Sequence, residues 1–191
     1  MMGLPCARWM RSASRGLKFV GKRQLVISSN EDRWMGIPFK NFDVTIPDVG
    51  EKELVEIGSD SGVKHLSIGS FPETPFPVKG RVHGMNIRLM APLVCRYNGN
   101  DEAKPHNVWF LVNSGSPYTC LTAKSLETLV GQGFVRDLNS FAIQVPSTNI
   151  ECRLSKDHFS EVNLLGMNAM RRLRLSIDLN WDTETFELIQ K

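Results

Sequence analysis

Alternating apolar and polar residues run through the chain after residue 77 and predict a mainly β protein. Strands are expected within residues 78–90, around a turn at 83–86, and then at 93–97 and 107–112. A second hairpin is predicted over residues 141–154 with a polar tip at 146–149, a buried strand over 162–166, and a third hairpin over 173–190. Helical spacing after Thr122, with Gly131 as a C-cap, predicts a short helix, and one or two helical turns are expected at 167–172.

The domain organisation follows from length and charge. The 191 residues, 41% of them hydrophobic, suit one domain of roughly 100 to 150 residues with a tail. Residues 1–30 carry six basic residues and no acid, which is typical of a mitochondrial transit peptide or of a basic tail on a cytoplasmic protein. Residues 31–77 are expected to form an irregular arm and a proline-rich linker, with short strands conceivable at 42–46 and 63–68, and residues 78–191 form the domain.

Composition argues against several classes of function. Outside the tail the net charge is −3, with no clustered basic stripe, so no nucleic-acid partner is expected. No apolar run approaches the roughly 20 residues of a membrane-spanning helix, so no membrane partner is expected either. The four cysteines are scattered without a CxxC pair and the four histidines are isolated, so neither a metal site nor a cofactor is predicted.

Two motifs in the predicted domain point to a site. The apolar run 110–112 ends at Asn113-Ser114-Gly115-Ser116, and about fifty residues later Leu164-Leu165-Gly166 precedes a short helix. This order resembles the retropepsin-like aspartic peptidases, whose signature is an apolar strand followed by Asp-Thr/Ser-Gly. The resemblance covers roughly residues 78–191. It implies a small closed β-barrel with one or two short helices, a flap made by the hairpin at 141–154, and a homodimer that binds a peptide or protein substrate.

The sequence departs from this family at the catalytic position. The family's chemistry uses two aspartates that share a proton, whereas this chain has Asn113, and a carboxamide cannot act as the general base. The resemblance gives Ser114 a hydroxyl that ties the active-site loops together and Gly115 the small residue that permits a tight turn. It implies substrate contacts at seven positions: Ser116, Ile143, Val145, Ser147, Thr148, Leu165 and Gly166.

Several explanations of Asn113 remain open at this point. The chain is a peptide-binding or scaffolding pseudopeptidase, an Asp-to-Asn form made to trap substrate, or an unrelated β domain with a coincidental match. Alternatively it is an active aspartic endopeptidase in which Asp137 or Asp157 supplies the acid, or in which deamidation of Asn113 restores it. A structural subunit of a mitochondrial assembly is a further alternative.

Other candidate chemistry is weaker. Ser116 lacks the G-x-S-x-G elbow of a serine hydrolase. Cys120 stands in an apolar setting, which favours a buried small side chain over a nucleophile.

Overall fold

The computed structural model describes residues 48–132 and 138–191, and these residues form a mainly β fold. The expectations for residues 1–30, for a strand at 42–46 and for Asp137 lie outside the described residues. The helices are α1 (Glu51–Asp60), α2 (Ala123–Val130) and α3 (Met167–Leu173), with a short 3-10 turn η2 (Asp157–Phe159). The strands, in chain order, are β1 (Val78–His83), β2 (Arg88–Tyr97), β3 (His106–Val112), β4 (Thr119–Leu121), β5 (Leu138–Ile143), β6 (Ile150–Leu154), β7 (Leu164–Leu165), β8 (Leu175–Asn180) and β9 (Thr185–Gln190).

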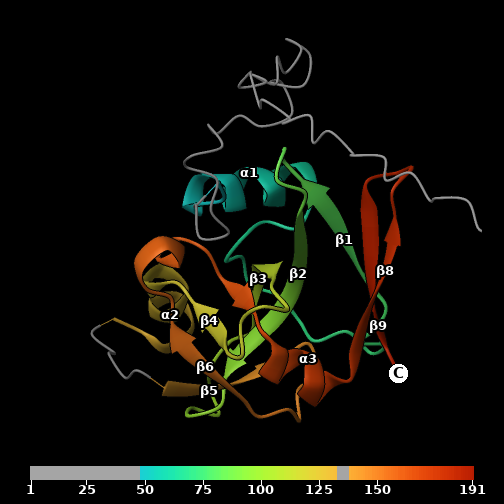
Figure 1. Cartoon of the computed structure of the whole chain (residues 1–191). Helices are drawn as coiled ribbons and strands as arrows, with labels where there is room; N and C mark the ends of the chain where they lie inside the picture. Colours follow the sequence, from blue (N-terminus) through green and yellow to red (C-terminus); the bar gives the residue numbers. More distant parts are fainter. Residues whose placement is uncertain (1–47, 133–137) are drawn as a thin grey trace, which may run out of the picture.

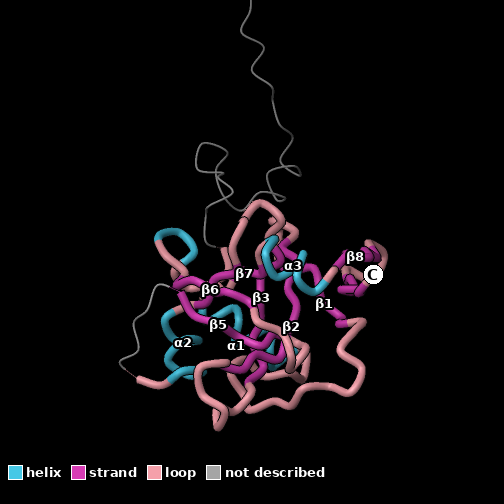
Figure 2. The backbone as a smooth tube through the Cα atoms, turned by 90° about the horizontal axis from the view of Figure 1, so that it is seen from below, coloured by secondary structure: helices cyan, strands magenta, loops and turns pink. Residues whose placement is uncertain are grey.

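Six of the strands close into a ring. Their order is β3-β7-β4-β6-β5-β2, and β2 pairs again with β3. Strand β2 closes the ring because it changes partner along its length: its first residues pair with β1 and its last residues with β5, while the middle pairs with β3. Figure 2 shows the ring strands gathered at the centre of the molecule. This architecture confirms the prediction of a mainly β domain built as a small closed barrel with short helices.

The interior of the ring explains the hydrophobic pattern of β3. Val108, Phe110 and Val112 point into the inner core, while Trp109 and Leu111 belong to a second cluster outside the ring. A strand that is buried on both faces reads as a continuous apolar run, as β3 does. The helices add to the inner core, because Leu126 and Leu129 of α2 and Ala169, Met170 and Leu173 of α3 are buried in it.

Helix α1 covers the outer face of the ring. We call the second cluster the outer cluster; its buried members are Val49, Leu54, Ile57, Met90, Trp109, Leu111, Val162 and Leu164. Gly50 starts α1, and its N–H donates to the Glu53 carboxylate at 2.8 Å. Figure 1 shows α1 lying across one side of the ring, with the β8–β9 hairpin standing next to β1. This helix lies where the sequence pattern suggested an irregular arm, and residues 63–68 form no strand apart from one bridge between Ile68 and His106.

The segment after α1 is fixed to the ring by Trp109 and His65. The Trp109 indole N–H donates to the Val63 carbonyl at 2.7 Å, and the Trp109 main-chain N–H donates to Nδ1 of His65 at 3.1 Å. Burial lowers the pKa of His65, Glu51 opposes this shift and Lys124 adds to it, and the resulting pKa is about 4. His65 is therefore a neutral hydrogen-bond acceptor in the fold.

The two predicted helices form as expected, whereas the buried strand expected over 162–166 is reduced to the two residues of β7. Thr122 caps α2 by accepting a hydrogen bond from the Ser125 N–H at 3.1 Å. The predicted third hairpin is formed by β8 and β9. Strand β4 was not predicted, because three residues are too short to show a period. No helix of the described residues is long and apolar enough to cross a membrane.

We predict that Gly166→Ala destabilises the fold severely. A Cβ at Gly166 would stand very close to the Tyr118 carbonyl group, which is backbone and cannot move aside. We expect the free energy of unfolding to fall by about 3 kcal/mol or more, as in overpacked cores. Urea unfolding checks this. Gly115→Ala is the matched control, since its nearest contact is the end of the Asn113 side chain, and it should cost less than about 1 kcal/mol; equal losses would contradict the prediction.

We also predict a pH dependence of stability from His65. Because the folded-state pKa of about 4 lies below the usual 6.5, the unfolded chain binds the proton more readily, and stability falls as the pH drops through this window. Between about pH 7.5 and pH 5 the loss from this residue should be about 2 kcal/mol.

Urea unfolding at the two pH values checks this in the natural protein and in His65→Asn, which should lose less stability on acidification. His158→Gln, at an exposed position, serves as the control and should behave like the natural protein. An unchanged pH dependence in His65→Asn would show that other groups cause it.

Candidate functional site

The two sequence motifs meet at one point of the ring. Strand β7 pairs in parallel with β3, placing Leu164 beside Leu111 and Leu165 beside Val112. The next residue after β3 is Asn113, and its main-chain N–H donates to the Leu165 carbonyl at 3.0 Å. The loop of Asn113 and the turn before α3 are thus neighbours, although fifty residues separate them in the chain.

The Asn113 side chain is held within its own loop. Its Oδ1 accepts the Gly115 N–H at 2.9 Å, and its main-chain oxygen accepts the Ser116 N–H at 3.2 Å. Asn113 is half-buried, while Ser114 and Gly115 are exposed. With Oδ1 engaged in this turn, the carboxamide nitrogen is the group of Asn113 that remains to donate a hydrogen bond outward.

A polar network behind the loop fixes the two motifs together. The Asn168 Oδ1 accepts from the Thr119 N–H at 2.8 Å and from its hydroxyl at 2.7 Å, while the Thr119 Oγ1 accepts the Gly166 N–H at 3.2 Å. In addition, the Met167 N–H donates to the Ser116 carbonyl at 2.8 Å. Ser116 therefore acts in positioning the loop, and its hydroxyl donates to the Tyr118 carbonyl at 2.6 Å.

Asn113 lies in a groove of about 730 Å³, which we call the Asn113 groove. Its walls combine apolar and polar groups from the β1–β2 turn, the end of β3, the following loop and the segment before β7. The lining residues are Asn86, Ile87, Arg88, Leu89, Leu111, Val112, Asn113, Gly115, Ser116, Pro117, Cys120, Ser155, Lys156, Phe159 and Leu164. This lining contains two cationic side chains and no carboxylate.

Asp48 holds the β1–β2 turn, which forms one wall of this groove. The Asp48 carboxylate accepts from the Asn86 side chain at 2.7 Å and from Arg88 Nε at 2.8 Å, and it pairs with the Arg88 Nη2 at 2.8 Å. Both charged side chains are about one-fifth exposed, at 20% for Asp48 and 19% for Arg88. The pair is therefore shielded enough from solvent to hold the turn in place.

The hairpin that the resemblance assigned as a flap lies elsewhere. Its strands β5 and β6 exist, but the tip after β5 is bound to the far end of β2: the Pro146 carbonyl accepts from Arg96 at 3.4 Å and the Thr148 carbonyl from Asn98 at 3.0 Å. Arg88, at the other end of β2, lines the Asn113 groove. Eight residues of strand separate Arg88 from Arg96, or about 26 Å along the strand.

Consequently the structure does not bring all of the predicted substrate contacts together. Leu165 and Gly166 lie against the Asn113 loop, and Ser116 lines the groove. The other four, Ile143, Val145, Ser147 and Thr148, lie at the hairpin and not in the groove; Ile143 is fully buried in the inner core. The Ser114 hydroxyl, which the resemblance linked to the second loop, has no hydrogen bond within the described residues.

Two further candidates have clear positions. Cys120 lines the groove, but burial raises the pKa of its thiol, an effect that the nearby Arg153 opposes, so the thiolate is disfavoured. Asp157 belongs to η2, between the groove residues Lys156 and Phe159, without lining the groove itself. Within the described residues no three His, Cys, Asp or Glu side chains are grouped as they would be around a metal ion.

The fold is similar to that of a solved structure. The chain is similar to the crystal structure of a retropepsin-like aspartic protease from Rickettsia conorii, with 14% sequence identity and a TM-score of 0.39. The alignment covers 63% of this chain and 98% of that one. No family model and no curated protein matches the chain.

Sequence reasoning missed the Asp48 contact and the groove walls at 86–89 and 155–159. The turn at 83–86 was visible in the sequence, but its position beside Asn113 follows from the register in which Met90 pairs with Leu111. Asp48 and Arg88 are forty residues apart, and neither belongs to a motif. No local signal in the sequence indicates that pairing.

We predict that Asp48→Asn loosens the β1–β2 turn. Replacing the carboxylate removes the counter-charge that Arg88 meets at 2.8 Å in a partly buried setting, which should lower the free energy of unfolding by about 2 kcal/mol. Hydrogen exchange of the amides at 84–88 should accelerate at least about tenfold. Glu56→Gln is the control, because it removes an exposed pair with Lys52 and should cost less than about 0.5 kcal/mol. Unchanged exchange in Asp48→Asn would show that the turn does not depend on this pair.

Proposed function

We propose that this chain is a catalytically impaired retropepsin-like protein that binds extended peptides in the Asn113 groove. The observation that carries the proposal is the parallel pairing of β7 with β3, which brings the Asn113 loop and the Leu164-Leu165-Gly166 turn together at one groove. These are the two motifs whose order resembles the retropepsin-like family. In this proposal the two motifs form the site, and the Asn113 carboxamide occupies the position of the family's aspartate.

The chemistry of the groove supports binding without hydrolysis. An aspartic peptidase needs a carboxylate pair that takes up one proton and activates water. Asn113 offers a neutral amide, and its free carboxamide nitrogen is suited to donate to a peptide carbonyl. No Asp or Glu among the described residues lines the groove to replace the missing acid.

The walls of the groove suit an extended chain. Ile87, Leu89 and Phe159 supply apolar surface for side chains, and polar groups of the Asn113 loop remain near them. Extended peptides are bound in this manner, with main-chain hydrogen bonds for affinity and alternate side chains in pockets. The β1–β2 turn borders the groove, and the hairpin at 141–154 does not. Ile87 of this turn, which is 47% exposed, is therefore a contact residue of the proposed site.

A homodimer is part of the proposal, because one copy of the motif supplies half of a two-fold site. In such a dimer both central positions are Asn113, and the acid pair is absent from both halves. An active endopeptidase would require a carboxylate that the groove's described lining lacks.

We predict that Asn113→Asp creates peptidase activity. At about pH 5 the natural protein should cleave a mixed peptide library no faster than buffer alone, whereas the variant should cleave at least about 100-fold faster, because two facing carboxylates can share a proton. Peptide fragments are measured by mass spectrometry, with light scattering on the same samples to report the oligomeric state.

Asn100→Asp, which places the same charge in an exposed turn, is the control and should remain inactive. Equal cleavage by the natural protein and Asn113→Asp would mean that another group supplies the acid. Failure of Asn113→Asp to cleave, when it is folded and dimeric, would remove the aspartic-peptidase lineage of the site.

A further inference from the structure

A second concave site lies on the outer face of the ring, next to the end of α1. We call it the Arg81 hollow; it has a volume of about 480 Å³. Its lining residues come from the segment after α1, from β1, β2 and β3, and from the β8–β9 turn with the start of β9. None of these residues lines the Asn113 groove.

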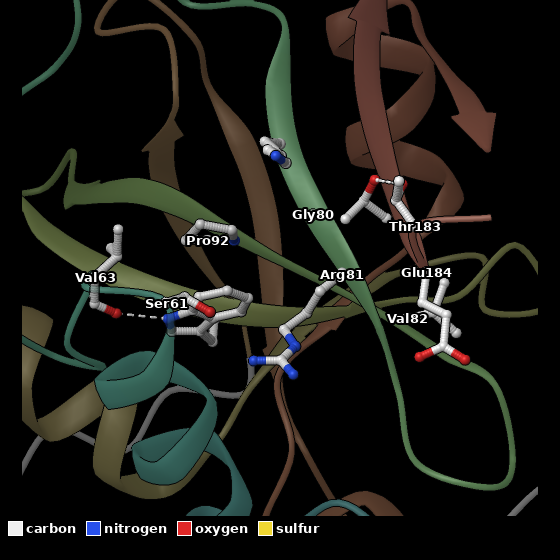
Figure 3. Close-up of a pocket in the computed structure, with 11 residues that line it drawn as sticks. Ser61, Val63, Gly80, Arg81, Val82, Pro92, Thr183 and Glu184 are labelled. Atoms are coloured by element: carbon white, nitrogen blue, oxygen red, sulfur yellow. Dashed lines mark hydrogen bonds between the residues drawn. The ribbon is translucent and has the colours of Figure 1, made fainter. Parts of the chain in front are cut away.

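Arg81 is the central polar group of this hollow. It lies between Met90 of β2 and Thr185 of β9 in the sheet register, so its side chain stands on the face that α1 and the outer cluster occupy. Figure 3 shows the Arg81 side chain reaching from β1 into the hollow on the side of Ser61 and Val63, while the Glu184 carboxylate points away from it.

No carboxylate of residues 48–132 or 138–191 forms an ion pair with the guanidinium of Arg81. Within the described residues Arg81 forms no salt bridge and its side chain has no hydrogen bond, although the residue is half-buried. A partly desolvated guanidinium with five unused N–H donors is well placed to bind an anion, and its planar fork matches a carboxylate in a bidentate manner. Lys79, on the same face of β1, adds a second cation at the rim.

The other lining residues indicate which kind of anion the hollow can bind. Lys79, Arg81 and Glu184 together carry one net positive charge, which suits a monoanion better than a phosphate dianion. Pro92 and Val63, both half-buried, give the hollow an apolar wall. Trp109 is buried behind them, at 1% exposed, and its indole N–H is already used by the Val63 carbonyl at 2.7 Å. Hydroxyl groups of Ser61, Thr183 and Thr185 lie around the rim.

We propose that the Arg81 hollow binds a monocarboxylate with an apolar body, the carboxylate pairing with Arg81 and the body lying against Pro92 and Val63. Such a ligand is a free aryl or alkyl acid or the C-terminus of a peptide that ends in an apolar residue. The proposal is independent of the function proposed for the Asn113 groove, because the two sites have no lining residue in common.

Calorimetry on the full chain at low salt tests this with five probes: 3-phenylpropionate, N-acetylphenylalanine, the neutral carboxamide of each, and phenyl phosphate. We expect each acid to bind at least about tenfold more tightly than its carboxamide. Tighter binding of N-acetylphenylalanine assigns the site to a peptide C-terminus, and tighter binding of 3-phenylpropionate assigns it to a free acid. Equal binding of acids and carboxamides, or tighter binding of phenyl phosphate than of either acid, would overturn the proposal.

Variants locate the site. Arg81→Met keeps the length and apolar stem and should weaken binding of the acids at least about tenfold while leaving the carboxamides unchanged. Arg172→Met, at an exposed position of α3, is the matched control and should bind like the natural protein. Acid binding that survives in folded Arg81→Met would overturn the proposal.

If Arg81→Met does not fold, the indole N–H resonance of Trp109 in the natural protein provides the test. This resonance should shift when the acid is added, and an unchanged resonance during binding would place the acid elsewhere and overturn the proposal.

Discussion

The position of every candidate group depends on the pairing of β7 with β3 inside the ring. Strand β7 has only two residues, so its ladder alone would be weak, and side chains reinforce it. Asn163, which is fully buried, accepts the Thr122 N–H at 2.9 Å and donates to the Trp109 carbonyl at 3.1 Å, joining three segments. Buried amide groups of this kind specify one arrangement, because any slip of the strand leaves several polar groups without partners.

This constraint accounts for the form of the groove. Once Leu165 is held beside Val112, the chain must turn at Gly166 close to the Tyr118 backbone, where a side chain has no room. The Asn113 loop is then fixed from behind, and its polar groups face the groove. The Asn113 side chain tightens the same loop from within, because its Oδ1 accepts the Gly115 N–H at 2.9 Å.

The sequence allowed much of the fold to be predicted, but only part of the site. The apolar run of β3, the cap at Thr122 and the two motifs are local patterns, and each lies where the pattern indicated. Helix α1 was missed because its buried positions, Leu54 and Ile57 with Gly58, form less than two turns of a helical period. The hairpin at 141–154 was predicted correctly as a hairpin but assigned to the wrong end of the barrel, since its location is set by the pairing of Cys95 with Ile143, which no local pattern encodes.

The segment from Asp48 to Val63 connects the two concave sites physically. At its start Asp48 holds the turn that borders the Asn113 groove, and at its end Ser61 and Val63 border the Arg81 hollow. Between them α1 buries Leu54 and Ile57 against the outer face of the ring. A chain beginning at residue 78 would expose the apolar surface of the outer cluster to water, at a cost of roughly 1.5 to 3 kcal/mol for each large side chain uncovered. Residues 48–63 are therefore part of the folded structure that shapes both sites, although they precede the barrel.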